Sequence, residues 1–523
     1  METLPQEVVD QIASNLYRPD LKSLLLLSPT LRMAAEKYSE GFTRCKLHYK
    51  NLDKFVEKFR GTRFCWLREL EFDLRLPEIL DHDGISPANG LAEAKAYDED
   101  DLSTQICALF NALKSLEDFD GPQGTIQLKI TSPERLDFNS TNTNHTASWH
   151  DHLHRLEQLP VLQSIGSLYV GPAANRQASN SFDKLGLRTP LDLSAKLPNL
   201  GMLRIDLIDE HHCDSESERN RVEAREDFAR VAQTVSLQVK RAEIILQSRK
   251  AHEILDHDSA MPNLVRAGLE DPFSSSLRVL CRHLTQLQLS VIIDKSFFWP
   301  DDGQGDIWPN MESLEVKFHP VTPTGSWYFV GPRGEGSNVQ GYPVDGIEYS
   351  GGGQVTEGDT IIMGHAPCRP SGWRLKPNPE TLHPLLAAFA KAAAKMPRLK
   401  EAMIWSPIWW SPGSHARTRF SYHSSFDMMN NQRPLGWGIG YNAPGTDREY
   451  DGLDSAASEE SDNENVRLFE WRTGSWEPSE EMKDLFHEIG RKEFGDEFDD
   501  DWDPDANQED LFFEGFCFGK ELN

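Results

Sequence analysis

The sequence predicts a mixed α/β fold, an α+β mixture, on two main observations. The first 45 residues have the apolar spacing of short helices. Further along the chain, a stretch of the form L-x-x-L-x-φ-x-φ (φ is apolar) recurs and ends in the alternation of a half-buried strand. Apolar helical segments precede several copies, most clearly "PETLHPLLAAFAKAAAKMPRL". Helices followed by turns and short strands therefore make up the body of the protein.

The first predicted helix begins at residues 3–6. Thr3 and Gln6 have the spacing of a capping box, and Pro5 falls in the first turn, where its missing N–H has no cost. Apolar side chains then follow on one helical face, at Val8, Val9, Ile12 and Leu16.

Two more helices are predicted before residue 45. Pro19 interrupts the first pattern, and Asp20 can cap a second helix over the leucines that follow. Ser28 and Pro29 form an N-cap and first-turn proline pair for a third helix, which Gly41 can end.

The size of this N-terminal segment limits its core. A domain of about 40 residues is near the lower limit at which a hydrophobic core is stable alone. The consecutive leucines Leu24 to Leu27 point all around a helix, so they cannot all face one small core. Some apolar surface is therefore left for a partner or for the rest of the chain.

The segment "LPQEVVDQIASNLYRPDLKSLLLLSPTLR" resembles an F-box, a three-helix motif. The family usually has Trp where this chain has Leu31, which weakens the match of the third helix only. The resemblance covers about a tenth of the chain. The matching positions are Leu4, Pro5, Glu7, Val8, Val9, Ile12, Leu16, Asp20, Leu21, Leu24, Leu27 and Ser28.

The resemblance implies that the N-terminal segment binds a Skp-type adaptor and, through it, a cullin–RING ubiquitin ligase. Some of the matching residues must form the motif's own core, and the sequence does not sort them. The alternative is a helical cap on a larger domain. The residues expected to contact the adaptor or to shape that surface are Leu4, Pro5, Val8, Val9, Ile12, Leu16, Leu21, Leu24 and Leu27.

The recurring strand stretch occurs at residues 67–74, 197–207, 284–291, 308–318 and 396–406, with a looser copy at 159–170. Helix, turn and short strand form the unit of leucine-rich repeat arrays, whose period is about 20–29 residues. Here the spacing runs from 27 to 95 residues. The combination resembles fungal-type F-box proteins with an irregular leucine-rich-repeat-like body and long insertions. Unrelated strands of an α/β domain are the alternative.

Composition shifts divide the chain further. The polar segments 83–101 and 131–147 are expected to be loops, and helix is expected after the charged segment 209–227, to about residue 250. The predicted domains are an F-box at 1–45, a repeat-like body at 46–320, a Gly- and aromatic-rich insertion at 321–380, a continuation of the body at 381–493 with a mobile acidic loop near 450–465, and an acidic C-terminal tail at 494–523.

The charge balance excludes some partners. Lys and Arg number 54 against 83 Asp and Glu, for a net charge of −29, which disfavours nucleic acid and anionic membranes. No apolar run reaches the roughly 18–20 residues of a membrane span. The seven cysteines are scattered without a CxxC pair, which fits a reducing compartment. We expect an intracellular protein of the cytoplasm, the nucleus or both.

Motifs for catalysis or metal binding are weak. The glycines at 331, 334 and 336 lack the helix and the GK[ST] of a phosphate loop, and the histidines of "HDHLH" (150–154) lack a completing ligand cluster. The acidic run from Asp501 lacks the Gly and Glu of an EF-hand. We therefore expect no catalytic residue, no metal and no cofactor.

The aromatic segment 404–415 is a second candidate site. Trp405, Trp409 and Trp410 lie just past a predicted strand and could contact a target protein, since aromatic side chains are common binding hot spots. They could instead pack at the end of a core, and the sequence favours this interpretation.

The primary hypothesis is a non-catalytic subunit that brings a target protein to a ubiquitin ligase. One alternative is a protein-binding scaffold, outside any ligase, whose helical head packs in cis on the body. An enzyme working through the Gly- and Trp-rich insertion is a weaker alternative, because no nucleophile–base pair is visible. The sequence does not identify the target.

Overall fold

The computed structural model places most of the helices and strands of the chain. Two compact units divide it: unit 1 is Met1–Leu207 with Arg230–Glu243, and unit 2 is Ile208–Ala229 with Ile244–Asn523. The structure describes residues 4–74, 91–120, 124–131, 158–172, 185–209, 215–235, 238–248, 261–266, 270–300, 303, 308–330, 374, 376–408, 435–446, 466–473 and 476–501.

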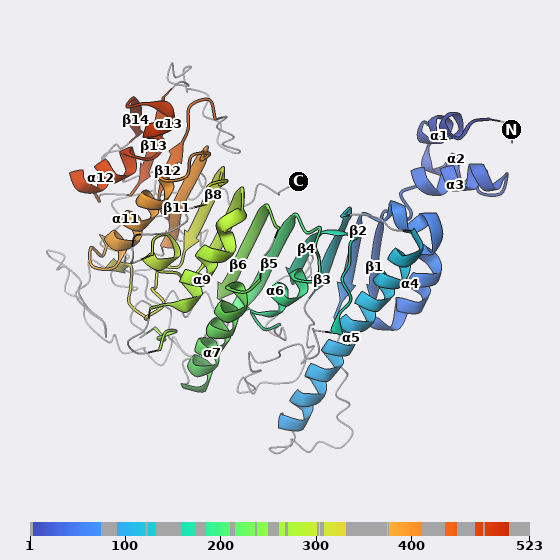
Figure 1. Cartoon of the computed structure of the whole chain (residues 1–523), viewed down its shortest axis with the longest axis horizontal. Helices are drawn as coiled ribbons and strands as arrows, with labels where there is room; N and C mark the ends of the chain where they lie inside the picture. Colours follow the sequence, from blue (N-terminus) through green and yellow to red (C-terminus); the bar gives the residue numbers. More distant parts are fainter. Residues whose placement is uncertain are drawn as a thin grey trace, which may run out of the picture. The chain divides into compact units, whose positions relative to one another are not determined.

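Unit 1 begins with three short helices and continues as a row of parallel strands (Figure 1). The strands pair in the order β1-β2-β3-β4-β5, each parallel to the next. The helices of the unit are α1 (Gln6–Ser14), α2 (Arg18–Leu24), α3 (Pro29–Tyr38), α4 (Leu52–Phe59), α5 (Leu91–Asp120) and α6 (Thr189–Ser194). Its strands are β1 (Arg44–His48), β2 (Glu69–Asp73), β3 (Ile126–Thr131), β4 (Ile165–Gly171) and β5 (Met202–Asp209), the last ending in unit 2, and the 3-10 helices η1 (Tyr49–Asn51) and η2 (Gly61–Trp66) flank α4.

Unit 2 also combines helices with mostly parallel strands. β7, β8 and β11 are parallel neighbours, β12 is antiparallel to β11 and β13, and β14 is parallel to β13. Its strands are β7 (Gln286–Val291), β8 (Ser313–Phe318), β9 (Phe329–Val330), β10 (Lys376–Pro377), β11 (Glu401–Ile408), β12 (Leu435–Asn442), β13 (Arg467–Arg472) and β14 (Phe498–Asp501). Its helices are α9 (Pro272–Leu280), η4 (Cys281–His283), η5 (Lys295–Phe297), α11 (Leu382–Ala393), α12 (Glu480–His487) and α13 (Arg491–Phe494). Helix α7 (Ser215–Ala232) and strand β6 (Arg241–Ser248) contribute residues to both units.

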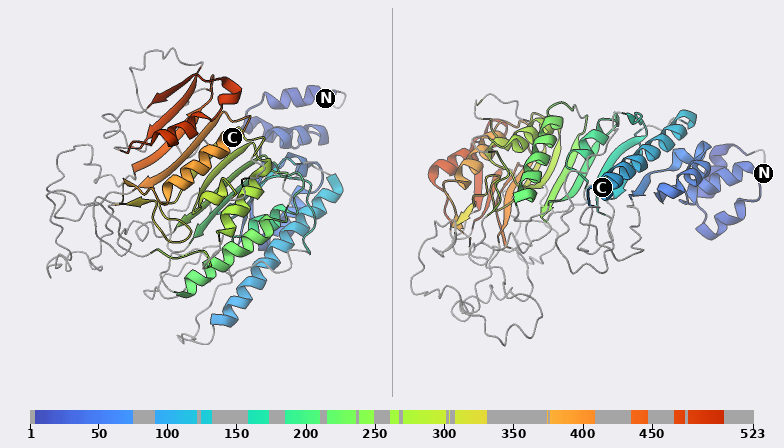
Figure 2. Two further views of the ribbon diagram at one scale, coloured as in Figure 1. Left: turned by 60° about the vertical axis from the view of Figure 1, so that its left-hand side comes forward. Right: turned by 90° about the horizontal axis from the view of Figure 1, so that it is seen from below.

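Helices cover one face of the strands within each unit, as Figure 2 shows for α5 in unit 1 and α9 in unit 2. The strands alternate accordingly. In β2, Leu70 and Phe72 are buried, whereas Glu69, Glu71 and Asp73 point to the opposite, partly exposed face. Strands β7 and β8 alternate in the same way. The predicted mixed α/β class is confirmed.

All six predicted strand stretches form strands: β2, β4, β5, β7, β8 and β11. In five of these stretches the residue at the first position of the L-x-x-L-x-φ-x-φ pattern is buried, and its N–H donates to the carbonyl three residues earlier, at 3.1–3.3 Å. These five residues are Leu67, Leu200, Leu284, Met311 and Leu399. The same turn therefore opens strands that lie far apart in the sequence.

A second contact recurs after this turn. The next two N–H groups donate to one carbonyl on the neighbouring strand's entry: Glu312 and Ser313 to Thr285, then Lys400 and Glu401 to Glu312. Lys240 and Arg241 donate to Gly201 in the same pattern. Strand β6, for which we expected helix, thus has the same entry as its predicted counterparts.

Three segments differ from expectation. Residues 91–101, expected to be loop, open helix α5; the stretch "LAEAKA" is rich in strong helix formers, and its polarity was misleading. The charged segment is itself helical, but α7 ends at Ala232 and β6 follows. Strand β14 falls within the predicted acidic tail, because pairing with β13 overrides its poor strand propensity.

The predicted Gly- and aromatic-rich insertion lies mostly outside the described residues. Its two ends do lie within them: β9 and β10 pair antiparallel, with Lys376 opposite Val330 and Pro377 opposite Phe329. The two ends of this segment are therefore held together by a short antiparallel pair. The predicted mobile loop at 450–465 and the residues after 501 are also outside the described part.

Candidate functional site

The three N-terminal helices, residues 4–38, enclose a small core; we call this segment the head. The core residues lie at helical spacing, as Val9 and Ala13 do on α1. Three of them are alanines, which allow the helices to approach closely but bury little apolar area. The core consists of Val9, Ala13, Leu21, Leu31, Ala34 and Ala35, with Leu16, Leu24, Leu25 and Tyr38 packed at its margin.

The helix ends follow the sequence only in part. The Ser28 hydroxyl accepts a hydrogen bond from the Leu31 N–H at 3.2 Å, and Pro29 begins α3, as predicted. Pro19, predicted to separate helices, instead lies in the first turn of α2. Pro5 is the N-cap of α1, and Thr3 lies outside the described residues.

The end of α3 also differs from expectation. Gly41 was expected to end the helix, but the residue with positive φ is Glu40, at 57°. Its carboxylate pairs with the guanidinium of Arg18, the first residue of α2. Glu40 thus has a backbone conformation that favours glycine, and its side chain contacts helix α2.

The head leaves a stripe of apolar side chains in water. Val8 and Ile12 are four residues apart and lie on one side of α1, and Leu4 lies just before the helix begins. The three side chains are 39–45% exposed. Tyr17, Leu26 and Leu27 add a second group before and after α2, and Leu26 is 88% exposed. We call these six residues the head patch.

The structure sorts the nine residues predicted for adaptor binding. Leu4, Pro5, Val8, Ile12 and Leu27 are exposed, whereas Leu16 and Leu24 are partly buried. Val9 and Leu21 belong to the core of the head. Sequence reasoning did not single out Tyr17 or Leu26. The run of four leucines was the available signal for Leu26, because at least one of them had to face away from the core.

Charged groups stabilise the head around this patch. The Lys37 ammonium donates to Asp10 at 2.6 Å and joins α3 to α1. This hydrogen bond lowers the pKa of Asp10 below its ordinary value and raises that of Lys37. Asp10 and Lys37 thus bind the helices to each other and leave the apolar stripe free.

The predicted target-binding tryptophans divide differently. Trp405 lies on β11 and is fully buried, with its indole N–H 3.3 Å from the Glu315 carboxylate and the Lys317 ammonium 5.2 Å from the ring centre. The same burial lowers the pKa of Lys317. Trp405 therefore offers no surface to a target in this structure. Trp409 and Trp410 lie outside the described residues.

Gly438 of β12 packs closely against the backbone and Cβ of Trp405. A Cβ there would lie 2.6 Å from the Trp405 Cβ and 2.9 Å from the Ile404 carbonyl oxygen. Gly438→Ala should therefore lower the free energy of unfolding by about 1–3 kcal/mol, the cost of overpacking. Gly440→Ala is the matched control, because its Cβ would meet Glu470 only at 3.6 Å. Denaturant unfolding followed by tryptophan fluorescence compares the two; equal stability of both variants would contradict the argument.

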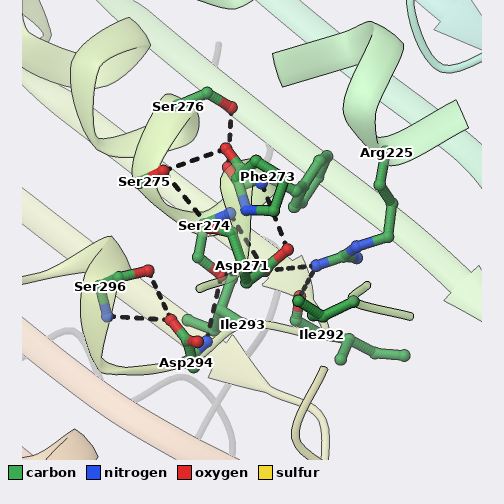
Figure 3. A network of polar contacts seen from close by, with 12 residues as sticks. Arg225, Asp271, Phe273, Ser274, Ser275, Ser276, Ile292, Ile293, Asp294 and Ser296 are labelled. Carbon is green, nitrogen blue, oxygen red and sulfur yellow. Dashed lines mark hydrogen bonds and ion pairs between the residues drawn. The ribbon is translucent and has the colours of Figure 1, made fainter. Parts of the chain in front are cut away.

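A buried polar network in unit 2 is the other cluster that could suggest chemistry (Figure 3). The Arg225 guanidinium donates to Asp271 at 2.7 Å and to the Ile292 carbonyl at 3.1 Å. Asp271 caps α9 by accepting from the Phe273 and Ser274 N–H groups and the Ser274 hydroxyl. Arg225 and Asp271 are 3% and 0% exposed.

The same network continues through Asp294. Its N–H donates to the Ser274 hydroxyl at 3.1 Å, and its carboxylate caps η5 by accepting from Ser296. Burial raises the pKa of Asp294 above its ordinary value. Both carboxylates cap helices, and the network holds together α7, α9 and the residues that follow β7.

The described residues give little support for a metal site or a membrane-spanning helix. Within them, no group of three or more His, Cys, Asp or Glu side chains is placed to hold a metal ion. No helix in the described ranges is long and apolar enough to cross a membrane. The histidines at 150–154 and the glycines at 331–336 lie outside those ranges, and so do Asp503 and Asp505.

Comparison with known proteins adds no family. The chain matches no protein-family model, and no curated protein matches it. The head patch and the strands of the two units are therefore the features from which a function can be inferred.

Proposed function

We propose that this chain is the substrate-recognition subunit of an SCF-type cullin–RING ubiquitin ligase, with the head docking on a Skp-type adaptor. One observation carries the proposal: the head patch stays exposed on a helical bundle whose core is very small. Fully burying a side chain such as Leu or Ile is worth about 1.5–3 kcal/mol, so this surface favours a partner.

The body would then hold the target. Within unit 1, the strand face opposite the helices presents alternating side chains that pair across strands, such as Lys129 with Glu69 at 2.7 Å and Arg204 with Glu243 at 3.2 Å. We propose that the strands with the shared entry turn are a degenerate leucine-rich-repeat-like array. Such arrays present extended surfaces to protein ligands.

The subunit would act without catalysing a step. Holding a target near a ubiquitin-charged enzyme raises the effective concentration of its lysines, and proximity supplies the rate. No described residue is assigned to bond making or breaking. The cytoplasm and the nucleus, where such ligases act, are the proposed compartments.

The alternatives have less support. A scaffold with its head packed in cis would bury the head patch on its own chain, but Tyr17 and Leu26 are more than 80% exposed. An enzyme working through the Gly- and Trp-rich insertion would use residues 331–373, which lie outside the described part.

Adaptor co-purification tests the proposal. The double variant Leu4→Ala/Pro5→Ala should lose co-purification with a Skp-type adaptor, while its circular dichroism spectrum stays that of the parent chain. Both side chains are exposed, so we expect the fold to tolerate their replacement by alanine. Undiminished recovery of the adaptor by this variant would remove the support for the proposal.

A further inference from the structure

The link between the head and the strands of unit 1 is narrow. Residues 39–43 form a linker after the head. Two hydrogen bonds join described residues of the head to residues beyond this linker, and Arg63 on η2 donates both. Its Nε and Nη2 donate to the two carboxylate oxygens of Glu36 on α3, at 2.8 and 2.5 Å. This bidentate geometry fixes orientation as well as distance.

Arg63 contacts the linker and α4 at the same time. Its guanidinium lies 4.7 Å from the ring centre of Phe42, and Nη1 donates to the Lys58 carbonyl at 3.3 Å. Phe42 in turn packs against Phe59 of α4, with ring centres 5.9 Å apart. One side chain therefore touches a head helix, the linker and the first helix of the body.

Partial burial makes this contact more than an ordinary surface pair. The Glu36 side chain is 14% exposed and that of Arg63 is 35% exposed. The linker itself is tied to the strands, because Thr43 accepts from the N–H groups of Arg68 and Glu69 at 2.8 and 3.0 Å. With the linker held at its far end, rotation of the head requires the Arg63–Glu36 contact to open.

We infer that Arg63 is a positioning residue that holds the head in one orientation on the first strands of unit 1. Under the proposed function, on which this consequence rests, a fixed orientation sets the spacing between the adaptor and a target held by the body. Tethering is most effective when the linker matches the span it must bridge. The structural part of the inference does not depend on ligase activity.

Pulsed electron paramagnetic resonance on the full chain tests it. Nitroxides are attached to genetically encoded ketone side chains at Ser14 on α1 and Lys54 on α4, both exposed. The parent chain should give one narrow distance distribution. Arg63→Ala and Glu36→Gln should each broaden it at least twofold, and the double variant should be no broader than the wider single variant, because both substitutions remove one contact.

Lys37→Ala is the matched control. It breaks the Lys37–Asp10 ion pair within the head and leaves the Arg63–Glu36 contact in place. Its distribution should stay as narrow as that of the parent. If both Arg63→Ala and Glu36→Gln give a distance distribution as narrow as that of the parent, the inference is overturned. Circular dichroism spectra of both variants check that the helices are intact.

Adaptor binding by the same variants separates this inference from the proposed function. Arg63 lies outside the head patch, so Arg63→Ala should bind the adaptor within threefold of the parent's affinity. If no variant and no parent chain binds the adaptor, the proposed function fails, while the distance distributions still decide the role of Arg63.

Discussion

Val8→Glu combined with Ile12→Glu is expected to weaken adaptor binding by at least about 100-fold, or about 2.8 kcal/mol. Both side chains lie on the exposed stripe of α1, at 39% and 45% exposure. In a docked complex the two new carboxylates would lose water without gaining partners, which costs several kcal/mol per ion. Isothermal titration calorimetry of the full chain with a purified Skp-type adaptor measures the change.

The same double variant should remain folded. Substitutions at exposed positions usually change the free energy of unfolding by less than about 0.5 kcal/mol each. Gln11→Glu with Ser14→Glu is the control, because it adds the same charge to the polar side of the same helix. Equal affinities of the two double variants would show that the stripe of α1 does not bind the adaptor.

Asp271→Ala is expected to cause the largest loss of stability. It leaves the Arg225 guanidinium buried without its counter-ion, for which about 3–5 kcal/mol is typical. It also removes the N-cap of α9, whose loss costs about 1 kcal/mol on its own. Denaturant unfolding followed by fluorescence reports mainly on unit 2, which holds Trp308, Trp405, Trp437 and Trp471.

Glu226→Gln provides the comparison for this measurement. Glu226 neighbours Arg225 on α7 and pairs with Arg266 at 2.6 Å, but the Arg266 side chain is 58% exposed. An exposed pair of this kind contributes about 0–1 kcal/mol. If the Asp271 and Glu226 variants lose similar free energy of unfolding, the buried Arg225–Asp271 pair contributes no more to stability than an exposed pair.

The sequence predicted the strands where the apolar alternation was clear. The stretches that contain Leu67, Leu284 and Leu399 all form strands, since their alternating side chains face helices on one side. Strand β6 was not predicted, because a charged helix precedes it and Val239 stands where the other strands have leucine or methionine at the first position of the pattern. Strand β14 could not be predicted locally, since Asp500 is held by Trp471 and His487, far from it in the sequence.

The candidate site was predictable as a segment but not residue by residue. Helical spacing placed Val8 and Val9 in one apolar set, yet a rotation of 100° per residue puts Val9 in the core and Val8 in water. Which side of α1 faces α3 depends on tertiary packing, so only the structure separates them. Trp405 shows the same limit, because it packs against Gly438 of the neighbouring strand β12, a contact that the local sequence does not indicate.

Hydrogen–deuterium exchange of the full chain, with and without a saturating Skp-type adaptor, shows whether the head patch is the adaptor-binding surface. We expect slower exchange in peptides covering residues 4–27, where the head patch would become buried, and unchanged exchange in strands β7, β8 and β11. Unchanged exchange across residues 4–27 at saturating adaptor, or protection confined to the strands, would contradict it.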